Sequence, residues 1–580
     1  MLRKKIMALI CIVGLSISLT ACGASEKTAT SDQSAVSEAS GNSSNKGSFL
    51  QNLTGGNKAD SAPAEMDGGS YYMEAETNGT GNYYVTESAE AMADMAVGAP
   101  IDPGFTYEGE YYEPDFNTEE YNFIKENSFL KVATSPLSTF AADVDTGSYT
   151  NFRRMINDNY SLEQIPMGAI RAEEMINYFD YDVKETRDNK RFAVSYETGV
   201  CPWNEDNDLL MMTVKAKDVD LEYVGNNFVF LIDSSGSMSS NDKGALAIRS
   251  FKLLAETLTE DDRVSIVTYS GSSRVVLDSC DGDNYRKICK ALDSIQFGGG
   301  TNGSGGITAA YELAEDNFME GGNNRVIIAS DGDMNLGVTS TGGLTELISE
   351  KKETGVFLTV LGYGTGNYSD ANMESLADCG NGNYHYIDCI EEAERVLVDQ
   401  LKQTTVTVAK DVKLQVEFNP TQVSEYRLIG YENRTMAAED FEDDTKDGGE
   451  TGAGQTVTVL YELVRSKDGN TGSDLKYQGD RELTDAALSG ELLTLSIRYK
   501  EPDGQRSVEE NFDVMAPAKT TDNLSEDLSF AAGVVELTMI INDSQYLGDA
   551  TLDTAYQLVK DGTADDEARE ELCKMMRNLR

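Results

Sequence analysis

The stretch Phe228-Val-Phe-Leu-Ile232, followed at once by Asp233-Ser-Ser-Gly-Ser237, decides how this chain folds. Five consecutive apolar residues predict a short buried strand, and the polar residues then lie at its carboxyl end. In open α/β sheets, ligands bind at that edge. A helix is predicted directly afterwards, over Lys243–Leu258, because apolar residues recur there with helical spacing. The sequence therefore predicts a strand–loop–helix unit with oxygen-bearing side chains in the loop.

Two later strand ends supply matching oxygens. Thr301 stands in Gly298-Gly-Gly-Thr-Asn302, and Asp331 follows Val326-Ile-Ile-Ala-Ser330. Three hydroxyls and two carboxylates form a hard-oxygen set that suits Mg²⁺ or Mn²⁺, with Ca²⁺ left open. The alternative is that these residues merely cap helices. The predicted metal ligands are Asp233, Ser235, Ser237, Thr301 and Asp331.

The order D-x-S-x-S, Thr and Asp, each at a strand end, resembles the metal-ion-dependent adhesion site of von Willebrand factor type A (VWA) domains. If hydroxyls are the main direct ligands, the ion keeps positive charge and an open position. The resemblance implies that a protein partner fills this position with an Asp or Glu carboxylate. The metal would then be an ion shared between two proteins.

Strands and helices alternate across residues 227–403, which predicts a doubly wound, mostly parallel sheet of the Rossmann-like VWA type. Residues 404–520 are rich in strand patterns and predict a β-sandwich. Strand patterns also occupy residues 190–226, so we expect the α/β domain to be inserted in this sandwich or flanked by it. Small helical regions are predicted over 105–189 and 521–580.

The N-terminus carries an export signal. Arg3-Lys-Lys5 precedes a mostly apolar stretch that is too short to span a membrane as a helix, which predicts a signal peptide over residues 1–21. Leu19-Thr-Ala-Cys22 resembles the bacterial lipobox, which implies that Cys22 is lipidated and anchors the protein to the cell membrane. The alternative is an ordinary secretory peptide. Residues 22–104 lack a sustained apolar period and predict a disordered tether.

Longer motifs resemble bacterial YfbK-type VWA lipoproteins over roughly residues 121–580. The motifs that carry this resemblance are Asp143-Val-Asp-Thr-Gly-Ser-Tyr149, Arg171-Ala-Glu-Glu-Met-Ile-Asn-Tyr-Phe179, Cys201-Pro-Trp-Asn204, Ser330-Asp-Gly-Asp-Met-Asn-Leu-Gly337 and Val416-Glu-Phe-Asn-Pro420. The family implies a fold, a metal site and an envelope location. It does not imply a known reaction.

Composition narrows the functional classes. The 99 acidic residues outnumber the 48 basic ones, giving a net charge of −51, so the chain should repel nucleic acid. The glycine-rich Gly298–Gly306 has no lysine in the P-loop position, which argues against a nucleotide. The acidic run Glu439–Glu450 fits no EF-hand loop and is interpreted as solvated.

Enzyme interpretations are weaker. Asp145-Thr-Gly-Ser148 matches half of an aspartic-protease site, but no second copy exists, and Ser148 is expected to cap a helix instead. His385 is the only histidine. Metal-assisted hydrolysis remains the alternative. We expect a non-enzymatic binding protein, an envelope scaffold or assembly factor, with a host- or matrix-directed adhesin as the alternative.

The chain has eight cysteines, of which Cys11 and Cys22 belong to the N-terminal segment. In an oxidising compartment, close spacing allows two short-loop disulfides. The candidate pairs are Cys280–Cys289 and Cys379–Cys389.

Overall fold

The computed structural model describes residue 121 and residues 124–579, except for 143–144, 184–189, 219–224, 302, 333–340, 353, 366–369, 381, 402, 404–405, 447, 468–482, 503, 505 and 518. The predicted signal peptide, the lipidation site Cys22 and the tether lie outside these residues. No helix in the described part of the chain is long and apolar enough to cross a membrane.

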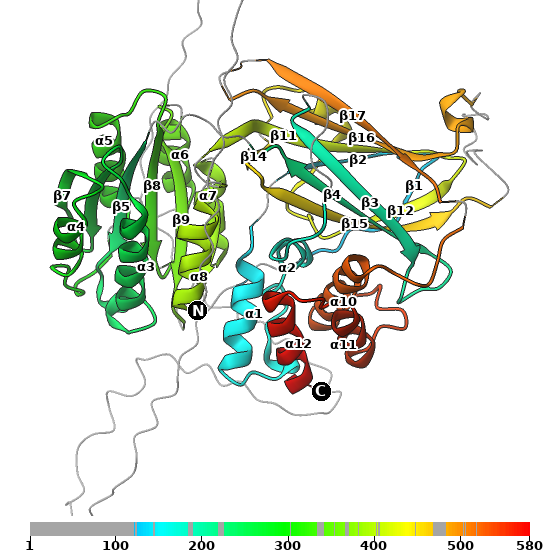
Figure 1. Cartoon of the computed structure of the whole chain (residues 1–580), viewed down its shortest axis with the longest axis horizontal. Coiled ribbons are helices and arrows are strands. Elements are labelled where there is room, and N and C mark those ends of the chain that lie inside the picture. Colours follow the sequence, from blue (N-terminus) through cyan, green and yellow to red (C-terminus); the bar gives the residue numbers. More distant parts are fainter. Residues whose placement is uncertain are drawn as a thin grey trace, which may run out of the picture. The chain divides into compact units, whose positions relative to one another are not determined.

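A six-stranded sheet forms the centre of the α/β domain (Figure 1), with the strand order β10-β9-β8-β5-β6-β7. Its strands are β5 (Asn226–Asp233), β6 (Arg263–Tyr269), β7 (Ser273–Asp281), β8 (Asn323–Ser330), β9 (Phe357–Tyr363) and β10 (Tyr384–Ile387). All neighbours pair in parallel except β6 and β7, which are antiparallel. The predicted doubly wound, mostly parallel sheet is confirmed.

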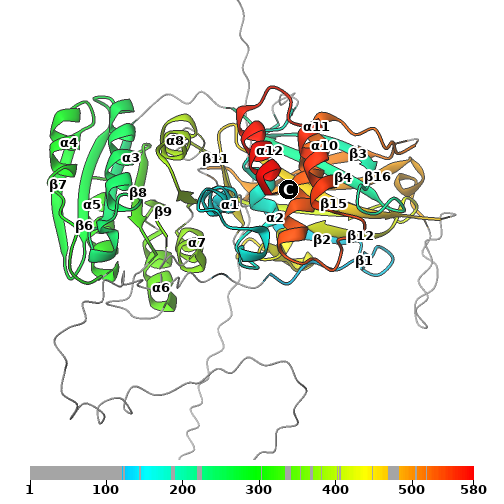
Figure 2. The same ribbon diagram turned by 90° about the horizontal axis from the view of Figure 1, so that it is seen from below.

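Helices cover both faces of this sheet. Successive side chains of a strand point to opposite faces, so both sets of side chains are buried. Phe228, Phe230 and Ile232 of β5 pack toward α3 (Gly244–Thr257), α4 (Tyr285–Leu292) and α8 (Ile390–Glu394). Val229 and Leu231 pack toward the other face. That face is covered by α5 (Gly303–Asp316), α6 (Thr341–Lys352) and α7 (Asp370–Cys379). Figure 2 shows α3, α4 and α8 on one side of the sheet and α6 and α7 on the other.

The sandwich consists of two mostly antiparallel sheets. One has the order β1-β12-β15-β4-β3, and its strands are β1 (Leu130–Lys131), β3 (Phe192–Val200), β4 (Asp208–Ala216), β12 (Val423–Ile429) and β15 (Thr456–Arg465). The other has the order β13-β2-β11-β16-β17, and β14 also pairs with β11. Its strands are β2 (Leu137–Ala141), β11 (Thr407–Phe418), β13 (Thr435–Met436), β14 (Gly449–Gly452), β16 (Glu491–Lys500) and β17 (Ser507–Met515).

The segment 105–189, predicted to be helical, differs from that expectation because it contributes β1 and β2 to the sandwich. The five residues of β2, Leu137-Ser-Thr-Phe-Ala141, do not alternate between apolar and polar, so no period-2 pattern indicates a strand. Its pairing with β11, from Lys413–Ala141 to Glu417–Leu137, supplies the hydrogen bonds that define it. The sandwich thus takes strands from both sides of the α/β domain.

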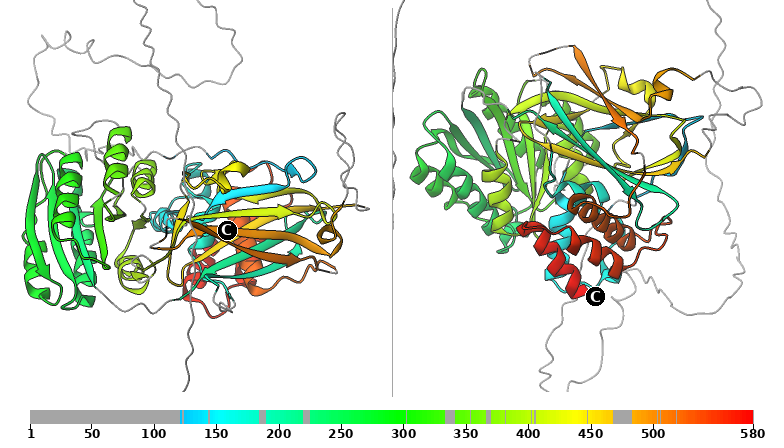
Figure 3. Two further views of the ribbon diagram at one scale, coloured as in Figure 1. Left: turned by 90° about the horizontal axis from the view of Figure 1, so that it is seen from above. Right: turned by 45° about the vertical axis from the view of Figure 1, so that its right-hand side comes forward.

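Helices from both ends of the described chain form a layer on the outer face of the five-stranded sheet (Figure 3). They are α1 (Gly147–Asn157), α2 (Ala172–Asn177), α10 (Glu526–Ile541), α11 (Leu552–Asp561) and α12 (Glu567–Leu579). Leu209 and Met211 of β4 and Leu460 of β15 belong to the same core as these helices. Trp203 is buried there and donates to a Glu462 oxygen at 3.1 Å.

The two predicted disulfides are not formed: Cys280, Cys289, Cys379 and Cys389 are free cysteines. Cys280 points into the α3–α4 core, and Cys289 lies on α4 beside Tyr285. Cys379 packs on the α5–α7 face of the sheet, whereas Cys389 precedes α8 on the opposite face. The sheet itself therefore separates the second pair, although the two residues are only ten positions apart.

Candidate metal centre

We call Asp233, Ser235, Ser237, Thr301 and Asp331 the metal edge. Asp233 is the last residue of β5, Ser235 and Ser237 follow that strand, and Asp331 follows β8. The Asp233 carboxylate accepts a hydrogen bond from the Ser235 backbone N–H at 2.8 Å. The Ser235 and Ser237 hydroxyl oxygens lie 2.9 Å apart. Asp233 and Ser235 are buried, while Ser237 is half-buried, so the hydroxyl pair leads from the interior toward the surface.

A glycine-rich loop is held against this serine loop by two backbone hydrogen bonds. The Gly298 N–H donates to the Ser234 carbonyl at 2.8 Å, and the Gly236 N–H donates to the Gly299 carbonyl at 3.1 Å. Gly299 has φ +93°, a conformation that side-chain-bearing residues rarely adopt. The same loop carries Thr301, which is buried, into the start of α5. The expectation that Thr301 follows a strand is wrong, because its loop follows α4; the two backbone hydrogen bonds bring this loop to the serine loop instead.

The end of β8 adds Ser330, and Asp331 follows it directly. Ser330 donates a hydrogen bond from its hydroxyl to Asp233 at 3.3 Å, which links β8 to β5. Asp331 is fully buried and forms an ion pair with Lys243, whose Nζ lies 3.1 Å from Oδ2. Lys243 immediately precedes α3 and is itself 6% exposed. A resident ammonium group therefore lies at the metal edge.

Burial raises the pKa of Asp233 to about 6, and the nearby Asp331 charge adds to this effect. Hydrogen bonds from Ser235 and Ser330 act in the opposite direction because they stabilise the carboxylate form. Among the residues that the structure describes, two buried carboxylates share the site with one ammonium group. This surplus of negative charge favours a cation.

The residues fit a hard divalent cation by donor chemistry, since they offer hydroxyl and carboxylate oxygens and no sulfur or imidazole. Within the described residues, no group of three or more His, Cys, Asp or Glu side chains could hold a metal ion. A metal at this edge would thus depend on the hydroxyls of Ser235, Ser237 and Thr301. Mg²⁺, which usually keeps several waters, suits such a sparsely charged ligand set.

Sequence reasoning missed Lys243 and Ser330 as members of the site. Ser330 could have been found, because it ends β8 directly before Asp331. Lys243 had no comparable signal: a lysine at the beginning of an amphipathic helix is usually solvated. Only the folded chain brings it to a carboxylate 88 positions away.

A second polar cluster joins α1 to the end of the α/β domain. We call Arg153, Tyr178, Asp388, Glu392 and Arg395 the junction cluster. The Arg153 guanidinium lies 2.5 Å from Asp388 and 2.9 Å from Glu392, and Arg395 lies 2.6 Å from Glu392. Although burial opposes ionisation, Arg395 and Arg153 lower the pKa of Glu392. Each charge in this cluster is compensated within the chain.

The protease-like motif is structural. Asp145 accepts a hydrogen bond from the Tyr384 N–H at 3.0 Å and pairs with Arg434 at 3.0 Å. The expected helix cap at Ser148 is wrong: α1 begins at Gly147, and the Ser148 hydroxyl donates to Glu174 at 2.8 Å. Inside the helix, Ser148 is already too late in the chain to cap it.

The single histidine is also buried in the structure. His385 lies on β10, and its Nδ1 is 3.4 Å from the Thr146 hydroxyl. Burial and the neighbouring Arg395 charge lower the pKa of His385 to about 4, so the imidazole is neutral at ordinary pH.

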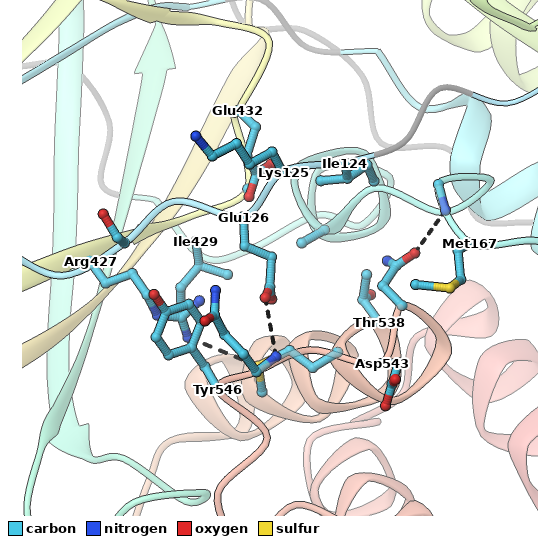
Figure 4. A pocket seen from close by; sticks show the side chains of 17 residues that line it. Ile124, Lys125, Glu126, Met167, Arg427, Ile429, Glu432, Thr538, Asp543 and Tyr546 are labelled. Atoms are coloured by element: carbon cyan, nitrogen blue, oxygen red, sulfur yellow. Dashed lines mark hydrogen bonds between the residues drawn. The ribbon is translucent and has the colours of Figure 1, made fainter. Parts of the chain in front are cut away.

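Away from the metal edge, a cavity of about 380 Å³ lies between α10 and β12 (Figure 4). Its wall includes Glu126, which accepts hydrogen bonds from the Ser544 hydroxyl and the Gln545 N–H. Figure 4 shows Ile429, Lys125 and Glu432 among the residues that line the same cavity. The polar groups that the figure joins by dashed lines bond to other wall residues. Hydrogen bonds between its own residues therefore hold the wall of this cavity together.

The sheet, its helices and the loops at its edge define a protein that carries a VWA domain. A family model described as "von Willebrand factor type A domain" matches residues 227–403. A model described as "Uncharacterized protein YfbK, C-terminal" matches residues 403–580, and one described as "von Willebrand factor" matches residues 115–211.

The chain is 40% identical over 451 residues to the Escherichia coli (strain K12) protein described as "Uncharacterized protein YfbK", covering 76% of this chain and 77% of that protein. The chain therefore belongs to the YfbK family of VWA-domain proteins. It is also 29% identical over 159 residues to human "Inter-alpha-trypsin inhibitor heavy chain H4", covering 26% of this chain and 17% of that one. A solved structure, "von Willebrand factor type A from Catenulispora acidiphila", is 14% identical with a TM-score of 0.37, covering 68% of this chain and 91% of its own.

Proposed function

We propose that this protein is an extracytoplasmic, membrane-anchored binding module that captures a carboxylate of a protein partner through a divalent cation. Asp233, Ser235, Ser237, Thr301 and Asp331 would hold the ion, with Mg²⁺ preferred and Mn²⁺ or Ca²⁺ as alternatives. When bound, the ion supplies a positive charge that two proteins share. A lipid on Cys22 would tether the module to the bacterial cell membrane, and the role we favour is that of an envelope scaffold or assembly factor.

The observation that carries this proposal is the graded burial of the metal edge. Asp233 and Asp331 are each 0% exposed, and Asp233 accepts a hydrogen bond from the backbone of Ser235, the buried member of the hydroxyl pair. Only Ser237 is half-buried, which leaves one side of the site open to solvent. A partner carboxylate can approach from that side, while the buried acids stay shielded from competing cations on the partner.

The neighbouring surface supports a partner with basic residues around its carboxylate. A cavity of about 490 Å³ is lined by Gly364, which lies against the Lys243 stem, and by Asp242, the residue before Lys243. Its wall holds five acidic residues and two arginines, and Asp388, Glu571 and Asp158 pair with those arginines. The remaining acidic residues of the wall are Asp242 and Glu391. A basic rim on the partner would complement them.

The decisive test is capture of a partner from membrane extract by the purified full chain, in Mg²⁺ and in EDTA, with Ser237→Ala as the variant. We expect a partner that is retained only by the wild type and only with metal. A matched control is Ser240→Ala, an exposed serine of the same loop, which should behave as wild type. Partners that ignore metal and the Ser237 substitution would move the binding function to the sandwich or to the helix layer.

A further inference from the structure

Lys243 carries an inference beyond the metal site itself. Its ammonium nitrogen lies 3.1 Å from an Asp331 oxygen, and both side chains are nearly inaccessible, at 8% and 0% exposure. By contrast, Lys252 on the same helix α3 pairs at 2.5 Å with Asp293, which is 62% exposed. Lys252 thus forms an ion pair at the surface, whereas Lys243 is a buried charge next to a carboxylate of the metal edge.

The stem of Lys243 runs through a channel that only a glycine permits. A methyl group added at Gly364 would lie 2.1 Å from Lys243 Cγ and 2.4 Å from Cε. Gly364 has φ +79°, and its carbonyl accepts a hydrogen bond from the buried Tyr386 hydroxyl at 2.8 Å. The loop after β9 therefore holds the lysine stem closely, and the ammonium group has little freedom to leave Asp331.

We infer that Lys243 makes cation binding at the metal edge conditional on a carboxylate from outside the chain. A divalent cation at this edge would share Asp331 with a fixed ammonium group, and two like charges a few ångströms apart repel in a shielded site. An added carboxylate offsets that repulsion. Metal and partner would then bind together, each strengthening the other by the same factor.

This inference rests on the proposed function and deepens it, because it assigns the coupling between ion and partner to one residue. Without Lys243, the two buried carboxylates Asp233 and Asp331 would attract a cation unaided. With it, the site stays weak toward free cations in the envelope. The Lys243 charge thereby makes cation binding depend on a ligand that carries a carboxylate.

The test is titration of the purified full chain with Mg²⁺ by calorimetry, in sodium chloride and in sodium acetate of equal ionic strength, acetate serving as the carboxylate probe. We expect Lys243→Met to bind Mg²⁺ about tenfold or more tightly than wild type in chloride, since one opposing charge is removed. We also expect acetate to strengthen Mg²⁺ binding in wild type and to have a smaller effect in the variant. Lys252→Met, the matched control, should behave as wild type.

Lys243→Gln, which keeps a polar head on the stem, serves as the second variant if Lys243→Met does not fold. Wild type that binds Mg²⁺ together with a Lys243 variant that binds it equally or more weakly would overturn the inference and leave the proposed function standing. Wild type and both variants that all fail to bind Mg²⁺, Mn²⁺ or Ca²⁺ would overturn the proposed function and the inference with it.

Discussion

The metal edge and the junction cluster both bury charged side chains, yet they treat those charges differently. In the junction cluster, Arg153 and Arg395 face Asp388 and Glu392 at 2.5–2.9 Å, so the charges balance inside the chain. At the metal edge, Asp233 and Asp331 face one lysine and several hydroxyls. The first arrangement holds two parts of the fold together. The second leaves a surplus of negative charge at a half-open site, as a binding site requires.

The largest loss of stability should come from breaking the junction cluster. Arg153→Ala removes the cation shared by Asp388 and Glu392, and leaving buried charges unpaired destabilises a protein by about 3–5 kcal/mol. Urea denaturation of the purified chain measures this loss. Mg²⁺ binding by whatever fraction remains folded should be unchanged. A loss below about 1 kcal/mol would contradict a structural role for the cluster.

A buried acid outside both clusters sharpens the comparison. Glu536 on α10 accepts a hydrogen bond from the Thr554 hydroxyl at 2.7 Å, and its Oε1 has no hydrogen-bond partner among the residues described. Burial raises the pKa of Glu536 to about 7. Because the folded pKa exceeds the unfolded value, the stability that protonation supplies is complete below about pH 4 and is lost as the pH rises through 7.

We therefore expect Glu536→Gln to be more stable than wild type at pH 8 by up to about 3 kcal/mol, with little difference at pH 4. Urea denaturation at the two pH values measures the change. The exposed Glu260→Gln is the control and should show no such dependence. Equal stability of Glu536→Gln and wild type at pH 8 would mean that the carboxylate is solvated there.

At the metal edge, a substitution should affect binding far more than folding. Ser237→Ala removes one hydroxyl from the 2.9 Å Ser235–Ser237 contact at a half-buried position, which should change the free energy of unfolding by less than about 1 kcal/mol. The rise in melting temperature that Mg²⁺ gives the wild type in sodium acetate should disappear. Thermal unfolding with and without Mg²⁺ checks both parts. A variant that keeps the full Mg²⁺ effect would exclude Ser237 as a ligand.

The smallest effect should be that of a reducing agent on the cysteines of the α/β domain. Cys379 and Cys389 lie on opposite faces, and Cys280 is buried apart from Cys289, so a reducing agent should leave the melting temperature unchanged. Burial raises the pKa of Cys389 to about 12, and its thiol should react slowly in the native state. Maleimide labelling of the unfolded, unreduced chain followed by mass spectrometry should modify all four cysteines. A tryptic fragment joining either pair would contradict this.

Local sequence determined much of the α/β domain. An apolar run of five residues placed β5, and the positions of Ser235 and Asp331 after strand ends placed them at one edge, because parallel strands of a sheet end together. Thr301 follows helix α4 instead, and backbone hydrogen bonds from Gly298 and Gly236 bring its loop to that edge. The cysteine pairs show where this reasoning stops. Close spacing in the sequence says nothing about which face of a sheet each residue reaches.

Only the tertiary structure decided the rest. Lys243 meets Asp331 88 positions later, β2 joins β11 across the whole α/β domain, and the Tyr149 hydroxyl on α1 donates to Glu571 on α12 at 2.8 Å. Periodicity within a window of a dozen residues carries no information about such partners. These contacts depend on how the finished layers pack. The chain itself thus determined the strand ends that form the metal edge, and the packing decided which charge stands beside it.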